Sequence, residues 1–384
     1  MFKFERRFFS LFASLLLKLD VGNLDDRHDR GYDRVRNLPG SADRERTSRH
    51  SQSSNFLSHS RGAQIKVIVT GGAGFIGSHI VDALLARGHS PFVVDNLSLG
   101  SRQNIPTDVP VFEVDIRDSA KLSQVFDEVK PDGVCHQAAQ VSVSRSMREP
   151  VFDAEVNILG LLNVLEQSAR VGAQRVVFAS SGGVLYGEVS TPATEDFPKR
   201  PISPYGISKW VGEQYLEFYA RERGLQGVAL RYSNVYGPRQ NPHGEAGVVA
   251  IFCTAMLAGQ IVTINGDGRY IRDYVYGPDV ASANVTALEI PMNQNFEAIN
   301  IGTGIGVDVN EVAEKLYELV QLELRKQRSS LQIPRWRHGV PRLGDLRSNL
   351  ISPIRAERIL GWKPAMSFDE GLRETVSRFG LKSN

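Results

Sequence analysis

Tyr205 and Lys209 are the residues whose types and spacing most directly indicate chemistry in this sequence. They open and close the run YGISK at 205–209, which follows Pro204, a residue that readily begins a helix. Four residues apart on a helix, the two side chains share one face. A tyrosine has a pKa of about 10 and a neighbouring ammonium lowers it, so Tyr205 could take a proton from an alcohol. The same spacing also occurs in surface pairs, so it needs a context.

A glycine-rich turn supplies that context. The run TGGAGFIG at 70–77 fits both G-x-x-G-x-x-G and G-x-G-x-x-G, and the glycines of the first pattern are Gly71, Gly74 and Gly77. Without β-carbons these positions allow a tight turn and a close approach to a pyrophosphate, which the following helix N-terminus attracts. Because a strand precedes the run and a helix follows it, the pattern predicts a dinucleotide site.

The acidic residue expected in such a site is Asp95, at the end of the second expected strand. A carboxylate there accepts both ribose hydroxyls of adenosine and repels a 2′-phosphate, which favours NAD over NADP, although Arg102 nearby would argue the other way. The alternative for Asp95 is a solvated turn residue. Asp115 and Ile116, after the third strand, could hold the adenine amine, but Asp115 could equally cap a helix over 118–129.

Ser180 and Ser181 end another expected strand. A hydroxyl there can bond the reacting oxygen and share its proton with Tyr205, and we favour Ser181 for this role. The alternative is a turn that uses both serines for backbone hydrogen bonds. Together these groups suit the oxidation of a carbinol, in which the tyrosine takes the proton and an oxidised nicotinamide takes the hydride.

Short apolar strands that alternate with helices must position these groups. Strands are expected at 65–70, 92–95, 111–114, 134–136, 176–179 and 227–231, and helices at 75–87, 118–129, 151–171 and 204–223. This order predicts an α/β fold with a Rossmann-type, doubly wound parallel sheet. We expect the NAD-binding domain over 63–235, with 272–304 returning to it, and a smaller, mainly substrate-binding α/β domain over 236–384.

Residues 1–62 differ in composition from the rest of the chain. Their greater part is rich in Arg, Asp, Ser, His and Asn and has no apolar period, so we expect a disordered extension or a natural start further downstream. The apolar run 8–17 has only half of the roughly 20 residues that a membrane span needs and lacks a cleavage site. No membrane partner is expected.

Charge and cysteine content narrow the class further. The net charge of +2 gives no electrostatic reason to expect nucleic acid as a partner. Cys135 and Cys253 lie far apart in apolar contexts, fit no metal-ligand spacing and favour a reducing compartment. We therefore expect a cytoplasmic protein without a metal.

From residue 65 to about 380 the chain resembles the extended short-chain dehydrogenase/reductase family of NAD-dependent epimerases and dehydratases, specifically its UDP-glucose 4-epimerase-like branch. The motifs that carry the resemblance occur in family order: TGGAGFIGSH (70–79), VDNLSLGS (94–101), HQAAQVSV (136–143), SSGGVLYGE (180–188), YGISK (205–209), LRYSNVYGPRQ (230–240), GDGRYIRDYVY (266–276), NIGTG (300–304) and RLGD (342–345). Residues 1–62 have no counterpart.

The resemblance implies further contacts. Phe75 and Ile76 would contact the pyrophosphate through their amides, and Ser233 would lie near the nicotinamide. Other residues would line the cofactor, namely Asp95, Asn96, Gln137, Ala138, Ala139, Gln140 and Asn157. The nucleotide diphosphate of the substrate would be gripped by Asn234, Arg272, Arg342 and Asp345. The charges agree, since two guanidiniums suit the two negative charges of a UDP-sugar.

The activity that the resemblance implies is 4-epimerisation of a UDP-hexose. Tyr205 would deprotonate the C4 hydroxyl while NAD takes the hydride, and the 4-keto sugar would turn over before the hydride returns. UDP-glucose and UDP-galactose are the first expectation. Asn349 stands where related epimerases carry a bulky tyrosine, so N-acetylated sugars are a second expectation.

Three other functions are weighed against this one. A nucleotide-sugar dehydratase or decarboxylase is less favoured, because Gly182 and Gly183 stand where related dehydratases carry an acidic pair. A UDP-glucuronate 4-epimerase would need a polar cradle for the C6 carboxylate, which the sequence does not identify. A non-catalytic NAD-binding regulator is least favoured, because Tyr205, Lys209 and Ser181 are all present.

The helices expected at 151–171 and 204–223 carry apolar stripes. These stripes could pack within one chain. The family implies instead that they pair across a two-fold axis, so a homodimer is expected on the resemblance alone.

Overall fold

The computed structural model describes residues 64–242, 247–342 and 345–381, and the extension expected at 1–62 lies outside them. The strands are β1 (Lys66–Thr70), β2 (Ser90–Asp95), β3 (Val111–Glu113), β4 (Gly133–His136), β5 (Arg175–Ser181), β6 (Gln226–Tyr232), β7 (Asn234–Tyr236), β8 (Thr263–Asn265), β9 (Ile271–Tyr276), β10 (Phe296–Ile301), β11 (Gly306–Asp308), β12 (Arg337–Gly339) and β13 (Ser348–Asn349). The α-helices are α2 (Phe75–Ala86), α3 (Ser119–Val129), α4 (Val143–Arg148), α5 (Pro150–Ala154), α6 (Gly160–Val171), α7 (Gly182–Leu185), α8 (Pro204–Glu222), α9 (Val248–Leu257), α10 (Gly277–Glu289), α11 (Val309–Lys326), α12 (Ile354–Leu360) and α13 (Phe368–Gly380).

The central sheet is parallel throughout. Its seven strands lie in the order β10-β6-β5-β4-β1-β2-β3. The direction of winding reverses between β1 and β4, where the carboxyl ends of the strands open a crevice for a ligand. The expected doubly wound α/β fold is confirmed.

Alternation along the strands builds a separate core on each face of this sheet. On β1, Val67 and Val69 pack into the core that includes residues of α2 and α10, whereas Ile68 packs into the core that includes residues of α3, α6 and α8. Both sets are fully buried. The near-continuous apolar strands of the sequence reflect this covering on two faces.

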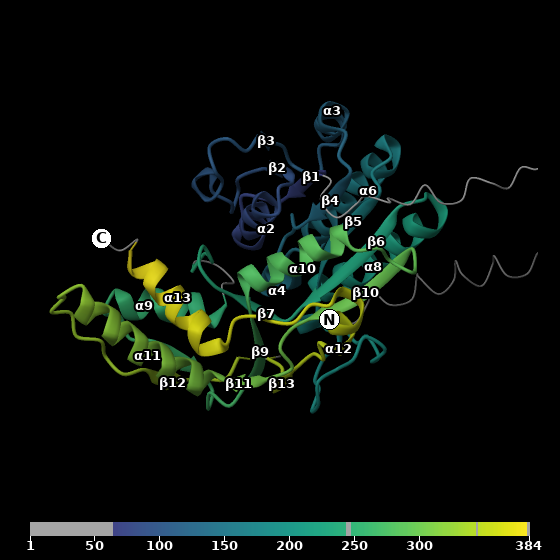
Figure 1. Ribbon diagram of the computed structural model, residues 1–384. Helices are drawn as coiled ribbons and strands as arrows, with labels where there is room; N and C mark the ends of the chain where they lie inside the picture. Colours follow the sequence, from purple (N-terminus) through teal and green to yellow (C-terminus); the bar gives the residue numbers. More distant parts are fainter. Residues whose placement is uncertain (1–63, 243–246, 343–344, 382–384) are drawn as a thin grey trace, which may run out of the picture. The chain divides into compact units, whose positions relative to one another are not determined.

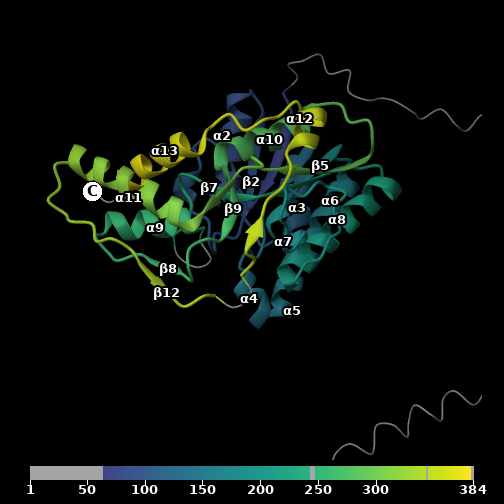
Figure 2. The same ribbon diagram turned by 90° about the horizontal axis from the view of Figure 1, so that it is seen from below.

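A second, smaller region follows β6. Strand β9 pairs with β7, β11 and β13, and β8 pairs with β12. Its core comes largely from α9, α11 and α13, which gather together away from the helices of the central sheet in Figure 1 and Figure 2. Of the segment 272–304, expected to return to the NAD-binding domain, α10 and β10 pack on or pair with the central sheet, whereas β9 belongs to the smaller region.

The helix expected as one piece over 151–171 is interrupted. A π-helical turn, η2 (Glu155–Leu159), separates α5 from α6. It carries Asn157, whose side chain bonds the backbone of Gln140 on both sides, at 2.9 Å each. Such π-turns are rare and often mark functional sites.

Candidate active site

The first turn of α8 carries the two central residues. Ser203 caps it by accepting a hydrogen bond from the Gly206 amide at 3.2 Å, and Pro204 occupies the first helical position. Tyr205 and Lys209 therefore lie one turn apart. The Lys209 ammonium is 5.7 Å from the centre of the Tyr205 ring.

Lys209 is enclosed at the carboxyl end of β5, with 4% of its surface exposed. Its Nζ donates to the Ala179 carbonyl at 2.8 Å and lies 5.0 Å from the centre of the Phe178 ring. Burial lowers the pKa of Lys209 to about 8, and the negative charge of Asp153 opposes that shift. At neutral pH, Lys209 is thus a buried ammonium beside Tyr205.

The chain alone keeps Tyr205 a protonated phenol. Burial raises the pKa of Tyr205 and the charge of Asp153 raises it further, while a hydrogen bond with Ser181 lowers it. The Lys209 ammonium does not outweigh these effects. A second positive charge beside the ring is needed before Tyr205 becomes a base near neutral pH.

The two serines at the end of β5 point to different partners. Ser180 is buried and donates to Glu213 at 2.5 Å, while Ser181 hydrogen-bonds Tyr205. Successive side chains of a strand face opposite sides, so only one of them can face the site. The geometry therefore leaves Ser181, and not Ser180, at the catalytic pair.

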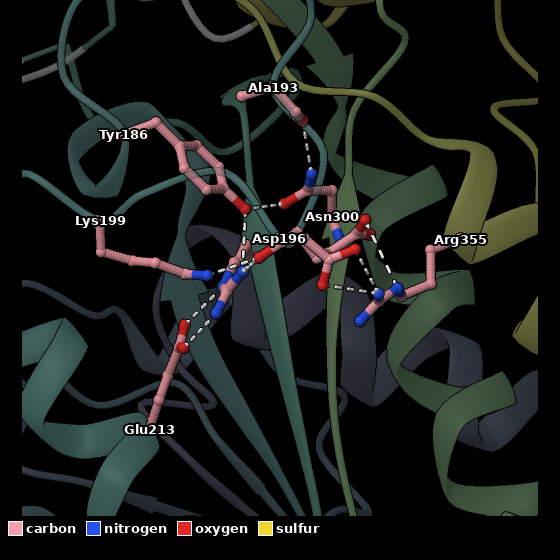
Figure 3. Close-up of polar contacts among 9 residues, drawn as sticks. Tyr186, Ala193, Asp196, Lys199, Glu213, Asn300 and Arg355 are labelled. Atoms are coloured by element: carbon pink, nitrogen blue, oxygen red, sulfur yellow. Dashed lines mark hydrogen bonds and ion pairs between the residues drawn. The ribbon is translucent and has the colours of Figure 1, made fainter.

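A buried polar network lies beside this end of the sheet (Figure 3). Arg231 forms an ion pair with Glu213 at 2.6 Å and donates to the Tyr186 hydroxyl at 2.9 Å. Tyr186 donates in turn to Asn300 at 2.7 Å, and Asn300 donates to the Ala193 carbonyl at 2.9 Å. The network joins β6, α8, β10 and the segment after β5. The network was not predicted from the sequence, because Arg231 lies inside a largely apolar strand and has no local signature there.

The glycine turn has the close contacts that its pattern predicts. Gly71 has φ +66°, and a β-carbon there would lie 2.6 Å from the amide nitrogen of Ala138. At Gly77 a β-carbon would lie 2.2 Å from the Gly71 carbonyl oxygen, and at Gly74 one would lie 3.1 Å from the same atom. Only glycine fits where β1, α2 and the segment after β4 converge, and this is the cradle that a pyrophosphate needs. Phe75 and Ile76 follow as the first residues of α2.

Asp95 ends β2 and reaches back to the turn. It accepts hydrogen bonds from the amides of Ala73 at 3.0 Å and Leu97 at 2.9 Å, and 7% of it is exposed. Burial raises its pKa. Asp95 is therefore not a solvated turn residue.

Asn96 and Asp115 lie side by side at the neighbouring strand ends. The Asn96 amide donates to Asp115 at 2.9 Å, and Arg117 donates twice to the same carboxylate, at 2.9 and 2.8 Å. Hydrogen bonds from Arg117 hold the pKa of Asp115 well below its usual range. The cap of α3 is Asp118, so the alternative role of Asp115 as that cap is wrong. Ile116 is buried in the sheet core.

The segment Gln137–Gln140 crosses over the glycine turn. The amides of Gln137 and Ala138 donate to the carbonyl and hydroxyl of Thr70 at 3.0 and 3.3 Å, and Ala139 is half-buried. Asn157 brackets Gln140 from η2. Both the oxygen and the nitrogen of the Asn157 side-chain amide are thus used in holding the backbone of this segment.

Asp153 is a member of this site that the sequence reasoning missed. It is fully buried, and it accepts from Ser208 at 2.6 Å, Gln140 at 2.8 Å and Asn157 at 3.0 Å. A single acidic residue in a helical stretch gave no signal.

The predicted substrate residues surround β9. Asn234 lies on β7 and donates to the Asp273 carbonyl at 3.2 Å, and the Ser233 hydroxyl donates to the Asp273 carboxylate at 3.4 Å. Arg272 forms an ion pair with Asp345 at 2.8 Å. Asn234, Arg272 and Asp345 thus lie together around β9, with Ser233 beside them. Arg342 is exposed, and its side chain makes none of these contacts.

Asp273 is the second buried carboxylate that the sequence reasoning missed. It accepts from the Thr303 amide at 2.9 Å, the Thr303 hydroxyl at 2.7 Å and the Gly304 amide at 3.0 Å. Burial raises its pKa. It ties β9 to the segment after β10, and therefore fixes Arg272 and Ser233 relative to the central sheet.

Asn349 pairs in register with Arg272 between β13 and β9. Only 1% of its surface is exposed, and its amide nitrogen donates to the Gly187 carbonyl at 3.3 Å. Its Oδ1 has no hydrogen-bond partner among the described residues. An acceptor is thus left free beside the Arg272 strand.

The part of the chain that the structure describes has no metal-ligating cluster and no membrane-spanning helix. No group of three or more His, Cys, Asp and Glu side chains there could hold a metal ion, and Cys135 and Cys253 are buried free thiols. No helix within these residues has the length and apolarity to cross a membrane.

Comparisons with known proteins show the family of this chain. Residues 67–302 match the model of the NAD dependent epimerase/dehydratase family. A UDP-glucose 4-epimerase of Mycolicibacterium smegmatis is 41% identical over 326 residues, 83% of this chain and 100% of that protein. A UDP-glucose 4-epimerase of Thermotoga maritima, solved with UDP-glucose, is 45% identical with a TM-score of 0.77, covering 83% of this chain and 100% of that one.

A third relative has another named substrate class. The UDP-N-acetylglucosamine 4-epimerase of Methanobrevibacter ruminantium, solved with UDP-N-acetylmuramic acid, is 33% identical with a TM-score of 0.74, and the match covers 84% of this chain and 99% of that one. The fold, the glycine cradle and the matched family model lead to one conclusion. This chain belongs to the NAD-dependent epimerase/dehydratase family.

Proposed function

We propose that this protein catalyses the 4-epimerisation of a UDP-hexose with NAD, through a transient 4-keto sugar. The observation that carries the proposal is the assembly of Tyr205, Lys209 and Ser181 at the carboxyl edge of a sheet that also bears the glycine cradle. UDP-glucose 4-epimerase relatives at 41% and 45% identity support the same reaction.

The residues present fit NAD. Gly71, Gly74 and Gly77 allow the tight turn that points backbone amides at a pyrophosphate, the amides of Phe75 and Ile76 begin α2, and Asp95 lies where a ribose would be held. The remaining cofactor contacts are proposed for Asn96, Asp115, Ile116, Gln137, Ala138, Ala139, Gln140, Asn157, Tyr205, Lys209 and Ser233. When bound, NAD supplies the hydride acceptor for the sugar carbon and the positive charge that Tyr205 lacks in the chain alone.

Tyr205 is proposed to take the proton of the C4 hydroxyl and later to return it. Ser181, which hydrogen-bonds Tyr205 in the chain alone, would donate its proton to the sugar oxygen once the substrate is bound and hold that oxygen in line. Lys209, with a pKa lowered to about 8, keeps its positive charge at neutral pH and stabilises the phenolate. Tyr205 and Ser181 thus act on the sugar oxygen, and Lys209 acts on the phenol oxygen of Tyr205.

The substrate diphosphate is proposed to be held by Arg272, with Asn234, Arg342 and Asp345 around it. Arg272 is steered by its ion pair with Asp345 at 2.8 Å. A guanidinium forks onto phosphate oxygens in the same way as onto a carboxylate. Anchoring at the diphosphate leaves the keto sugar free to turn and present its other face.

The sugar is proposed to be glucose or galactose first, with N-acetylated sugars as the second candidate. Asn349, with a free Oδ1 and a smaller side chain than tyrosine, supports the second, and so does the UDP-N-acetylglucosamine 4-epimerase relative. The ratio of kcat/KM for UDP-glucose and UDP-N-acetylglucosamine decides between them.

The rival dehydratase reaction lacks support at Gly182 and Gly183. Neither position carries the acid that elimination of water requires, and a β-carbon at Gly182 would lie 2.9 Å from Ile351. An acidic side chain at that position would therefore need a rearranged neighbour. A UDP-glucuronate 4-epimerase is the other alternative, and the described residues give it no identified carboxylate cradle.

The test compares the wild type with Tyr205→Phe on a panel of UDP-sugars, read by chromatography of the products. We expect the wild type to interconvert C4 epimers and the variant to lose turnover by roughly 1,000-fold, because the base is gone. NAD should remain bound, since the phenol hydroxyl is not part of the glycine cradle. A variant with near-normal turnover, or a wild type that releases a dehydrated sugar, would contradict the proposal.

We also propose that the protein is a homodimer. The exposed faces of α5, η2 and α8 carry large apolar side chains, namely Val151, Leu159, Ile207 and Phe218 at 70%, 55%, 49% and 43% exposure. Because α5 and η2 both contact α8, large apolar side chains exposed on all three favour an interaction surface. The double variant Ile207→Glu, Phe218→Glu should halve the mass measured by light scattering, and an unchanged mass would contradict this dimer.

A cytoplasmic location is proposed on the two buried free thiols, Cys135 and Cys253. Unpaired cysteines are typical of a reducing compartment. Fractionation of cells that express the full chain tests this, and recovery in a secreted or membrane fraction would contradict it.

A further inference from the structure

Asp153 is a buried carboxylate for which the proposed reaction has no use so far. None of its surface is exposed, and both of its oxygens accept hydrogen bonds. Oδ1 accepts from Gln140 and Asn157, and Oδ2 accepts from Ser208 at 2.6 Å. Its hydrogen bonds are therefore satisfied by neutral groups, and its negative charge is not neutralised by any of them.

These contacts join three parts of the site. Gln140 belongs to the segment that crosses the glycine turn, Asn157 to the π-turn η2, and Ser208 to the first turns of α8. Ser208 directly precedes Lys209 in the chain. Asp153 thus fixes the turn that carries Tyr205 and Lys209 against the segment expected to line the cofactor.

A charge buried among neutral donors needs a counter-charge, because desolvating an ion costs several kcal/mol. Lys209 is the group that can supply it, since 4% of it is exposed and its ammonium donates only to the neutral carbonyl of Ala179 in the contacts described. Ser208, which donates to Asp153, directly precedes Lys209 on α8, and the negative charge of Asp153 acts on both Lys209 and Tyr205.

The other charged or titratable groups on the elements around α8 do not compete for this role. These groups include His136 on β4, the Arg145–Glu149 pair on α4 and the Glu213–Arg231 pair between α8 and β6. Three further charged residues, Arg148 on α4, Glu155 on η2 and Glu166 on α6, are exposed, so solvent screens their charges. Burial lowers the pKa of His136 to about 3, so it is neutral. The two pairs are each neutral as a whole.

We propose that Asp153 is a positioning residue for the reaction, whose buried carboxylate balances the Lys209 ammonium and locks the Tyr205–Lys209 turn against the cofactor segment. This inference rests on the proposed roles of Tyr205 and Lys209. It assigns a function to a charge that none of those roles requires.

The test is Asp153→Asn, which removes the charge and keeps the shape. An asparagine Oδ1 can still accept from Gln140 and Asn157, and its amide can donate to the Ser208 hydroxyl, so all three contacts can be retained. Without the negative charge, Lys209 holds its proton less tightly and Tyr205 loses a repulsion. Both limbs of the pH profile of kcat should therefore move to lower pH, by about one pH unit.

Ser208→Ala is the matched control. It removes a hydrogen bond to the same carboxylate and leaves the charge in place, so it should lower kcat without moving either limb. Tyr205→Phe, measured in parallel, separates the two proposals, since its loss of turnover supports the reaction whatever Asp153 does.

Three outcomes would overturn the inference. The first is an Asp153→Asn profile with both limbs where the wild type has them. The second is an equal displacement in Ser208→Ala, which would assign the effect to geometry. The third is an Asp153→Asn chain that fails to fold by circular dichroism, because the carboxylate would then be needed for the fold rather than for Lys209.

Discussion

The cofactor side and the substrate side of the molecule place their residues by different means. On the cofactor side, the glycine turn, Asp95 and Gln137–Gln140 all follow strand ends of one parallel sheet, so the fold brings them together automatically. On the substrate side, Asn234 and Arg272 lie on strands of a small sheet, and Asp345 reaches Arg272 from a segment 73 residues further along. The first arrangement depends on backbone shape and the second on side-chain contacts between distant segments. Substitutions should therefore affect the two sides differently.

The largest effect is expected for Gly77→Ala on the cofactor side. The added β-carbon would lie 2.2 Å from the Gly71 carbonyl oxygen, so the turn must open. We expect no NAD to remain bound after gel filtration, read from the absorbance of the purified protein. Gly88→Ala is the control, because Gly88 has a positive φ of +78°, which Gly77 does not have, and nothing lies near its added carbon. That variant should keep NAD and lose about 1 kcal/mol of stability.

Asp273→Ala should have the next largest effect, and on the substrate side only. The change leaves the amides of Thr303 and Gly304 without their acceptor, which costs about 3 kcal/mol of unfolding free energy. We expect KM for the UDP-sugar to rise by roughly 100-fold with NAD still bound. Loss of NAD from this variant would show that the two sides are not separable. Asp267→Ala, which removes an exposed carboxylate paired with Arg347, should have a much smaller effect.

Arg272→Met should raise KM for the UDP-sugar by roughly 10-fold, because one charged contact to the diphosphate is lost. The stem of the side chain is kept, so packing should change little. Arg347→Met is matched to it, since Arg347 also pairs with an aspartate but is half exposed. Equal KM values for the two variants would argue against the placement of the diphosphate at Arg272.

The smallest effect concerns pH, and its sign differs between the two sides. His136 has a pKa lowered to about 3 by burial, so below its unfolded value of about 6.5 the unfolded chain binds a proton that the folded one does not. The contribution of neutral, buried His136 to the free energy of unfolding is therefore fully present above pH about 6.5. Below that pH it declines by up to about 1.4 kcal/mol per pH unit.

Asp273 has a pKa raised by burial, so the folded chain takes up its proton first and acidification favours that region. On going from pH 7 to pH 5, the hydrogen-exchange protection factors should therefore fall in β4 before they fall in the segment after β10. The opposite order, or His136→Asn with an unchanged pH response in β4, would contradict this assignment.

Much of the cofactor side could be predicted from the sequence, because glycine spacing, strand periodicity and strand-end residues report the backbone directly. The ends of α8 were expected within one residue for the same reason, from Pro204 and the apolar period. Asp153 and Asp273 could not be predicted in this way. Each owes its role to partners from other segments, and an isolated acid inside an ordinary helix or strand has no local signature. The π-turn at Asn157 was missed because its cause, the contact with Gln140, is likewise not local.

The Glu213–Arg231 ion pair under β5 has a consequence for strand pairing. If β5 slipped by one residue against β6, Ser181 would turn under the sheet and Ser180 would face Tyr205, since the side-chain period of a strand is two. The purely apolar part of β5 resists such a slip only weakly, because valine and phenylalanine fit either face. The hydrogen bond from Ser180 to Glu213, and the pairing of that carboxylate with Arg231 opposite Ser180, are available in one alignment alone. A buried charge pair thereby decides which of two adjacent hydroxyl groups faces the reacting oxygen.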